Sequence, residues 1–305
     1  MSDNTSIKIV LPVVAISLTF ALMGLSFPDY LLYIQYPLLG ILVMAIGLPH
    51  GATDYLLFRR MNKTKLTNKQ ILNFFTIYLS AVFGFLGLWM VFPTLSFIIF
   101  ILISSYHFGQ SNWENVSLPK SVTYLLNLLW GLFAVGGAVL WHWEESKTII
   151  SQVIGNLPDY TQSTMNYIQF WIICINIGLI IFLKFSDFIS FNRLWKEIGK
   201  IVILSFMFFF TPMLVGFTLY FTLWHSLGSL LNQLAFYKKI WPGFTLKDYY
   251  RQAAPYTILA LIGFIIMVSG HSYMLPGVSI ISTFLVFIAC VTLPHIFVVH
   301  ESYQQ

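Results

Sequence analysis

The feature of this sequence that most constrains its fold is a succession of long apolar stretches joined by short polar ones. A helix needs about 20 apolar residues to cross a bilayer. Ten stretches approach that length: residues 8–27, 31–58, 70–92, 95–112, 121–141, 165–185, 197–212, 216–237, 254–271 and 278–300. The connections are too short for a soluble domain. The sequence therefore predicts an all-α polytopic membrane bundle of about ten transmembrane helices, in one domain over residues 1–305.

Composition supports this class. Only 9% of the residues are charged and 58% are hydrophobic, whereas soluble domains carry about 25% charged residues. The weakest boundary lies at Pro212, where one long apolar stretch becomes either two spans or one kinked helix. Cys174 and Cys290 lie in separate spans without a CxxC pattern, so we interpret them as packing residues.

Positive charge predicts the topology, because cytoplasmic loops carry an excess of Lys and Arg. With a cytoplasmic N-terminus and ten crossings, fifteen of the sixteen Lys and Arg fall on the inner side, and only Lys147 lies outside. We therefore expect a multi-pass protein of the cell (inner) membrane with both termini cytoplasmic. The net charge of +5 then reflects topology and anionic lipids, and no basic motif suggests a nucleic acid partner.

Five of the seven histidines lie in strongly apolar segments, where a polar ring is costly. Four of them belong to four different spans and map to the inner half of the bundle: His50, His107, His225 and His295. Neutral imidazoles bind a transition metal without adding charge, so this set predicts a metal site inside the membrane. His142 and His271 map to the outer ends of spans, where a histidine costs little.

Two polar residues are candidates for orienting the ligands. Asp54 follows His50 by one helical turn on the same face, and Asn112 follows His107 by five residues at the helix end. Metal-bound histidines usually donate their other ring N–H to such a neighbour.

The segments around these histidines resemble, in order, the signature blocks of the Brp/Blh family of β-carotene 15,15'-dioxygenases. The blocks are Gly47-Leu48-Pro49-His50-Gly51-Ala52-Thr53-Asp54, Ser104-Ser105-Tyr106-His107-Phe108-Gly109, Trp224-His225-Ser226 and Thr292-Leu293-Pro294-His295. They span residues 47–300, so that residues 1–30 form an extra N-terminal helix outside the motifs.

The resemblance implies a membrane enzyme with a histidine-bound non-haem Fe(II), which splits the central double bond of β-carotene with O₂ into two all-trans-retinal molecules. The implied iron ligands and catalytic residues are His50, His107, His225 and His295, with Asp54 supporting the first. The implied partners are β-carotene or a related carotenoid, O₂ and the lipid bilayer, and retinal could pass to a rhodopsin.

This chain departs from the family pattern at three places. The third block often reads HSxxH, but Ser229 stands at its second histidine, and the residue closing the second block is commonly Asp but is Asn112 here. Where the family often has an acid, this chain has His300 followed by Glu301. His295 and His300 are about 140° apart on an ideal helix, so we favour His295 as fourth ligand, with His300 as the alternative. We expect Ser229, Asn112 and Glu301 to lie near the ligands as hydrogen-bonding groups.

Aromatic residues near the motifs are candidates for lining a tunnel and stabilising a cationic polyene. They are Tyr106, Phe108, Tyr220, Phe221, Trp224 and Phe297.

Two other functions would use the same histidines. A haem- or metal-binding electron carrier or transporter could hold its group between histidine pairs, and a Soret band would reveal haem. A catalytically inactive relative that binds carotenoid or retinal is suggested by Ser229. A rhodopsin is disfavoured, because its Schiff base needs an intramembrane lysine and every Lys maps to a loop or helix end.

Overall fold

In the computed structural model, every regular element of the described residues is a helix. The backbone is described for residues 3–62, 66–113, 116–274 and 277–303, and the side chains for these residues except 3–9, 271–272, 274 and 302–303. Eight helices in this part of the chain are long and apolar enough to cross a membrane. Two more, α1 (Asp3–Ser26) and α10 (Phe191–Phe210), coincide with the remaining predicted spans. The predicted class, an all-α polytopic membrane protein, is confirmed.

The chain divides into two compact units, each assembled from three separate stretches of sequence. Unit 1 comprises Met1–Gly47, Ser105–Ser146 and Asp159–Gly243, and unit 2 comprises Leu48–Ser104, Lys147–Pro158 and Phe244–Gln305. Two divisions fall inside helices, namely α6 (Pro93–Trp113) and α8 (Trp143–Ile154). The sequence does not predict α8, because its 12 residues carry two acids in the first turn and are too few and too polar for a span. The single domain over residues 1–305 stays a prediction.

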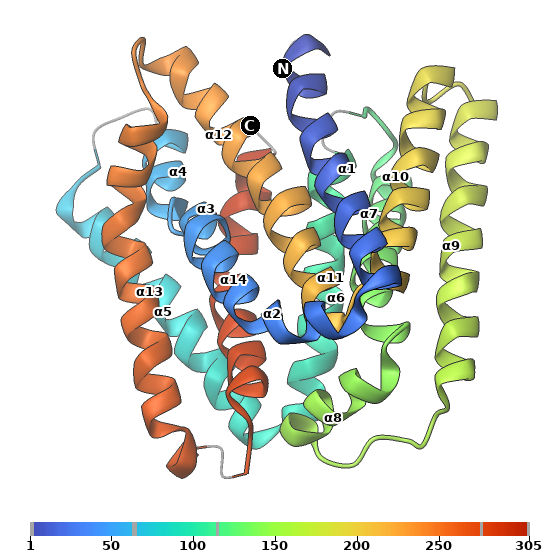
Figure 1. Cartoon of the computed structure of the whole chain (residues 1–305). Helices are drawn as coiled ribbons and strands as arrows, with labels where there is room; N and C mark the ends of the chain where they lie inside the picture. Colours follow the sequence, from blue (N-terminus) through green and yellow to red (C-terminus); the bar gives the residue numbers. More distant parts are fainter. Residues whose placement is uncertain (1–2, 63–65, 114–115, 275–276, 304–305) are drawn as a thin grey trace. The chain divides into compact units, whose positions relative to one another are not determined.

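Unit 1 is built around α7 (Lys120–Leu140), which packs against α9 (Gln162–Phe185), α10 and α11 (Met213–Leu219). Helix α1 runs along α10 (Figure 1). The other elements of the unit are α2 (Pro28–Leu42), the π-helices η1 (Val43–Gly47) and η2 (Tyr220–Ser226), and α12 (Leu227–Ile240). Its apolar core includes Trp130, Phe133 and Phe208, all buried. This core fixes the helices that carry the polar residues of unit 1.

Helices α6 and α7 cross in direct backbone contact at two glycines. A Cβ atom on Gly109 would overlap the backbone of Asn127, and one on Gly131 would overlap the backbone of Ser105. Small residues permit such close crossings between membrane helices. The two contact points lie two residues on either side of His107, so the crossing fixes the backbone that carries this histidine.

The apolar stretch at Pro212 forms two helices. Thr211 adopts an extended conformation and Pro212 precedes the first residue of α11, as expected where proline cannot continue a helix. Helix α10 also begins before the predicted span, at Phe191, because Ser190 caps its first turn. Lys200 therefore lies in the interior of a helix, which corrects its predicted place at a helix end.

His142 and Glu145 connect the end of α7 to the α10–α11 break. The His142 Nε2 atom lies 2.8 Å from the carbonyl oxygen of Phe208, and the backbone N–H of Met213 donates to Glu145 Oε2 at 3.3 Å. Burial raises the pKa of the Glu145 carboxyl, against the opposing effects of the Met213 N–H and His142. These contacts give His142 a structural partner at the end of the span.

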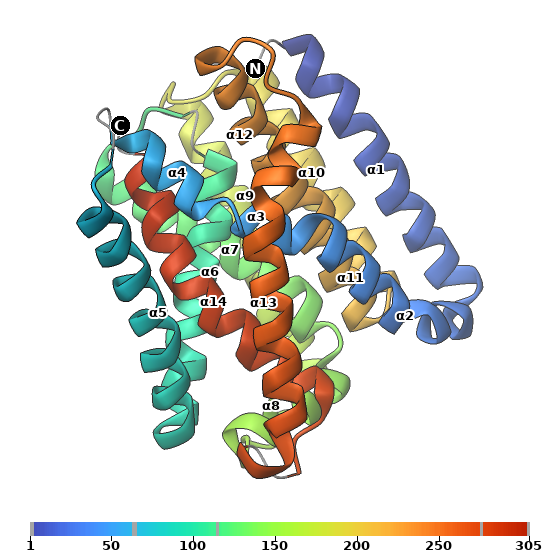
Figure 2. The ribbon, with the colours of Figure 1, turned by 90° about the vertical axis from the view of Figure 1, so that its left-hand side faces the viewer.

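Unit 2 is organised around α14 (Ile280–Tyr303), which packs against α4 (Asp54–Met61), α5 (Asn68–Val91) and α13 (Leu246–Met274) (Figure 2). The short helix α3 (Leu48–Gly51) packs against α13. The apolar core of the unit includes Trp89, Val286 and Cys290. Cys290 is a free thiol, as is Cys174 on α9, in agreement with their interpretation as packing residues.

Candidate metal centre

The first pair of candidate ligands lies within unit 1. His107 on α6 and His225 on η2 have ring centroids 4.9 Å apart, with their planes at 75°. Their exposed fractions are only 2% and 4%, which places both rings in the protein interior. The segment carrying His225 is π-helical, a local irregularity that often occurs at functional sites. The rings of two separate helices thus meet inside the unit.

Ser111 orients the ring of His225. The Ser111 hydroxyl donates to the carbonyl oxygen of Phe108 at 2.9 Å, and its oxygen lies 3.2 Å from His225 Nδ1. Because the hydroxyl proton is directed to Phe108, the Ser111 oxygen accepts a hydrogen bond from Nδ1–H of His225. The lone pair of His225 then lies on Nε2. Ser111 follows His107 by four residues, a spacing that places both on one helix face and that sequence reasoning overlooked.

Asn112, the residue predicted to support His107, points to a different part of unit 1. Its side-chain amide donates to Glu197 Oε2 at 2.9 Å, and its Oδ1 accepts from Lys200 Nζ at 2.8 Å. Both partners belong to α10. The polar residue that contacts a histidine is thus its neighbour Ser111.

Aromatic rings surround His225 within unit 1. Phe108 meets the His225 ring edge-on at 4.7 Å between centroids, and Phe221 lies nearly parallel to it at 6.3 Å. Tyr220 contacts Phe108 at 5.5 Å. A Cβ atom on Gly47 would come within 2.8 Å of the Phe221 ring, so the glycine of the first motif leaves room for this ring. Three predicted tunnel residues are therefore grouped around one candidate ligand.

The second pair of candidate ligands lies within unit 2. His50 on α3 and His295 on α14 have ring centroids 4.9 Å apart at 85°, and both are buried. The His295 Nδ1 atom is 2.7 Å from Asp54 Oδ1. Tyr78 on α5 donates its hydroxyl to Asp54 Oδ2 at 2.9 Å. The carboxylate thus accepts a hydrogen bond from Nδ1–H of His295 and leaves the Nε2 lone pair available, an arrangement that is common for metal-binding histidines.

A tight turn places His50 and Asp54 on separate helices. The Thr53 hydroxyl donates to the carbonyl oxygen of His50 at 2.9 Å. Tyr249 of α13 lies close to the same turn, with its hydroxyl 3.4 Å from Thr53 Oγ1. Because the turn interrupts the helix, His50 and Asp54 do not lie on one helical face, although they are four residues apart. The sequence assigned Asp54 to His50, whereas its hydrogen bond is made to His295.

The remaining predicted site residues of unit 1 have other surroundings. Trp224 Nε1 donates to Ser17 Oγ of α1 at 2.9 Å, and Tyr106 packs against Tyr124 with centroids 5.9 Å apart. Ser229 is half-buried on α12, one turn after His225.

In unit 2, Phe297 is 64% exposed, which directs it away from the buried histidines. His300 is half-buried and Glu301 is exposed. Helix α14 is continuous through His295 and His300, so the two rings leave the helix in different directions. His271 lies on α13, and its side chain falls outside the described part of the chain.

The donor set fits a transition metal bound by imidazoles. His50, His107 and His225 are each buried, and each offers a ring nitrogen that could bind a metal ion. In His225 and His295 a hydrogen-bond acceptor at Nδ1 leaves Nε2 as the coordinating atom. Each unit therefore contains two buried imidazoles, one of which has a hydrogen-bond partner at Nδ1.

Comparison with known proteins gives a family match. Residues 41–301 match the family model described as beta-carotene 15,15'-dioxygenase. A protein of that name from the uncultured marine bacterium 66A03 is 29% identical over 192 residues, which are 61% of this chain and 64% of the relative. The match thus covers less than two thirds of the relative. No solved structure matches the chain.

Proposed function

We propose that this chain, which belongs to the β-carotene 15,15'-dioxygenase family, cleaves β-carotene or a related carotenoid at its central double bond. The observation that carries the proposal is the family match over residues 41–301, which contains both pairs of buried histidines. The reaction consumes one O₂, and each oxygen atom becomes the aldehyde oxygen of one retinal. Two all-trans-retinal molecules are the expected products.

The cofactor in this proposal is Fe(II). His50, His107, His225 and His295 would hold it, in keeping with the neutral donors that both units present. Imidazole is a suitable ligand for iron, and bound iron supplies the redox chemistry that O₂ needs to react with an alkene. Asp54 would not bind the iron itself, but would hold the His295 ring through its hydrogen bond to Nδ1.

The protein's own residues would orient the ligands and the substrate. Ser111 and Asp54 fix the rings of His225 and His295. Phe108 and Phe221 present apolar faces next to His225, where they would contact the polyene and exclude water. Tyr220, packed on Phe108, would extend the same surface.

The proposed location follows from the substrate. Carotene is an apolar rod that dissolves in the bilayer, and a helical membrane protein can accept it without an aqueous transfer step. We propose the cell inner membrane, with both termini cytoplasmic, as the charge distribution predicts. Retinal released there would be accessible to a retinal-binding partner such as a rhodopsin.

The proposal is tested by expression in β-carotene-producing cells, followed by chromatography of the apolar extract. We expect carotene to disappear and retinal to accumulate at two molecules per carotene. His107→Ala and His225→Ala should each abolish cleavage and remove most of the iron, which is expected at about one ion per chain. His142→Gln is the matched control, because His142 contacts a backbone carbonyl at the end of α7. Unequal products would indicate cleavage away from the centre.

Two results would favour the alternative functions. A Soret band in the purified protein would point to haem and contradict the non-haem assignment. Persistence of carotene beside a folded, iron-containing protein would support the inactive relative. In that case Ser229→His, which introduces an imidazole one turn after His225, should create activity in the otherwise inert chain.

A further inference from the structure

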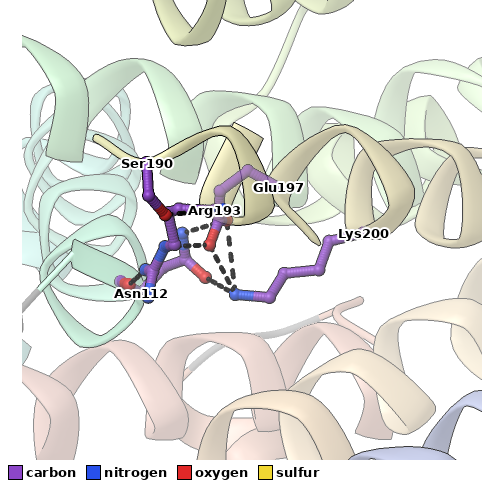
Figure 3. A network of polar contacts seen from close by, with 5 residues as sticks. All are labelled: Asn112, Ser190, Arg193, Glu197 and Lys200. Atoms are coloured by element: carbon purple, nitrogen blue, oxygen red, sulfur yellow. Dashed lines mark hydrogen bonds and ion pairs between the residues drawn. The ribbon is translucent and has the colours of Figure 1, made fainter. Parts of the chain in front are cut away.

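A charged cluster joins the C-terminal end of α6 to α10 (Figure 3). Glu197 is fully buried and forms ion pairs with Arg193 Nε at 2.7 Å and with Lys200 Nζ at 3.0 Å. Asn112 of α6 donates to Glu197 and accepts from Lys200, at 2.9 and 2.8 Å. Arg193 also donates to the backbone oxygen of Asn112 at 2.9 Å. Three of these five contacts thus link Asn112, at the end of α6, to residues of α10.

The cluster is electrostatically matched to the end of a helix. Its two cations and one carboxylate leave a formal charge of +1. The last carbonyls of α6 form the negative end of the helix dipole, which favours a cation there. Two indole rings add further stabilisation, since Arg193 lies 5.5 Å from the Trp113 ring centroid and Lys200 lies 5.9 Å from that of Trp130. The excess positive charge of the cluster therefore lies where the dipole of α6 favours it.

The contacts restrain the rotation of the last turn of α6 and its position along α10. Ser190 accepts from the backbone N–H of Arg193 and so fixes the start of α10. Lys200, two turns further along α10, holds the side chain of Asn112. Arg193 and Lys200 thus hold Asn112 from two points along α10, which opposes rotation of this turn and its sliding along α10. The adjacent residue, Ser111, carries the hydroxyl that meets His225.

We propose that Arg193, Glu197 and Lys200 are positioning residues for the histidine pair of unit 1. They hold Asn112, and with it the helix turn from His107 to Ser111, in the register that lets Ser111 orient His225. Buried ion pairs seldom add net stability, but they can specify one arrangement among several. The inference rests on the proposed metal-binding function. It attributes the geometry of the His107–His225 pair to a cluster whose described hydrogen bonds to α6 are made through Asn112 and not through the histidines.

Lys200→Met gives the sharpest test, because it removes the tether to Asn112 and leaves Arg193 and Glu197 as a neutral pair. The purified protein is titrated anaerobically with Fe(II), and separately with Co(II), whose visible absorption reports its coordination. We expect Fe(II) affinity to fall about 10-fold to 100-fold, as for other residues that support metal ligands, with a changed Co(II) spectrum. Lys200→Arg should restore most of both signals.

The matched control is an exposed ion pair of the same unit. Lys184 Nζ lies 3.0 Å from Asp187, whose side chain is 89% exposed. Asp187→Asn should leave metal affinity and the Co(II) spectrum unchanged. If Lys200→Met fails to fold, Asn112→Ala carries the same test, since it removes the side chain that Lys200 holds.

A double-mutant cycle tests the route through Ser111. Lys200→Met should cost less affinity in a Ser111→Ala background than in the wild type, because both changes disturb the same contact. Independent effects would overturn this route, and an unchanged Co(II) spectrum in folded Lys200→Met would overturn the inference. A wild-type protein that binds neither ion would instead refute the proposed metal site, so the two failures are distinguishable.

Discussion

At the scale of single residues, Asp54 connects two side chains that lie far apart in the sequence. Its two carboxylate oxygens meet His295 and Tyr78 at 2.7 and 2.9 Å. Hydrogen bonds to a carboxylate are shorter and stronger than those between neutral groups. Asp54 therefore fixes the plane and the tautomer of His295 more firmly than a neutral acceptor would.

Replacement of Asp54 should weaken metal binding in proportion to the acceptor lost. We expect Asp54→Asn, which retains an oxygen for Nδ1–H, to lower Fe(II) affinity about 10-fold, and Asp54→Leu to lower it about 100-fold. Anaerobic titration of the purified proteins measures both. Tyr78→Phe should have a smaller effect, because the His295 contact remains. Equal affinities for all three variants and the wild type would show that Asp54 does not support the metal site.

The sequence singled out four histidines, but it predicted few of their contacts. All four predicted histidines are buried, and they form one close pair in each unit. Ser111 and Tyr78 were not foreseen, since a serine and a tyrosine among many carry no distinguishing pattern. The Asp54–His295 contact joins residues 241 positions apart, and helical periodicity gives no information on such a separation.

At the scale of the elements, the α6–α7 crossing depends on two reciprocal glycines. Each glycine faces the backbone of the other helix, and backbone atoms cannot move aside as a flexible side chain can. The crossing therefore ties the position of His107 to the identity of Gly109 and Gly131.

Gly109→Ala should separate the two helices and destabilise the fold. Overpacking in a close-packed core typically costs about 1 to 3 kcal/mol, and a clash with backbone belongs at or above the upper end of that range. Unfolding in detergent with increasing denaturant measures the loss. Gly178→Ala on α9 is the control, because a Cβ atom there meets nothing within 4 Å, and alanine should be neutral or stabilising. Comparable stability of the two variants would disprove the close crossing.

Hydropathy predicted where the long helices lie, because apolar length follows from bilayer thickness. It did not predict the π-helices η1 and η2, since one extra residue in a turn leaves an apolar stretch equally apolar. It also missed α8, whose polar first turn resembles a loop. The Pro212 boundary was recognised because proline acts locally on the backbone.

At the scale of the whole molecule, the distribution of Lys and Arg predicts how the chain lies in a membrane. A reporter fused after Lys63 or Lys239 should be cytoplasmic, and one fused after Lys147 should be external, because positive loops stay inside. Protease protection or a compartment-specific reporter in intact cells measures this. Reporters found on the opposite sides of the membrane would contradict the ten-span topology.

Because each unit is assembled from separate stretches of sequence, residues that contact one another are synthesised at different times. Asp54 cannot form its hydrogen bond to His295 until His295 has been synthesised, 241 residues later. At 5 to 20 residues per second, that interval is roughly 12 to 50 s. During this time the nascent chain already holds His50, while its partner helix α14 has not left the ribosome. Under the proposed metal-binding function, the set of four histidines would accordingly be complete only after α14 is synthesised, and metal would be loaded after translation.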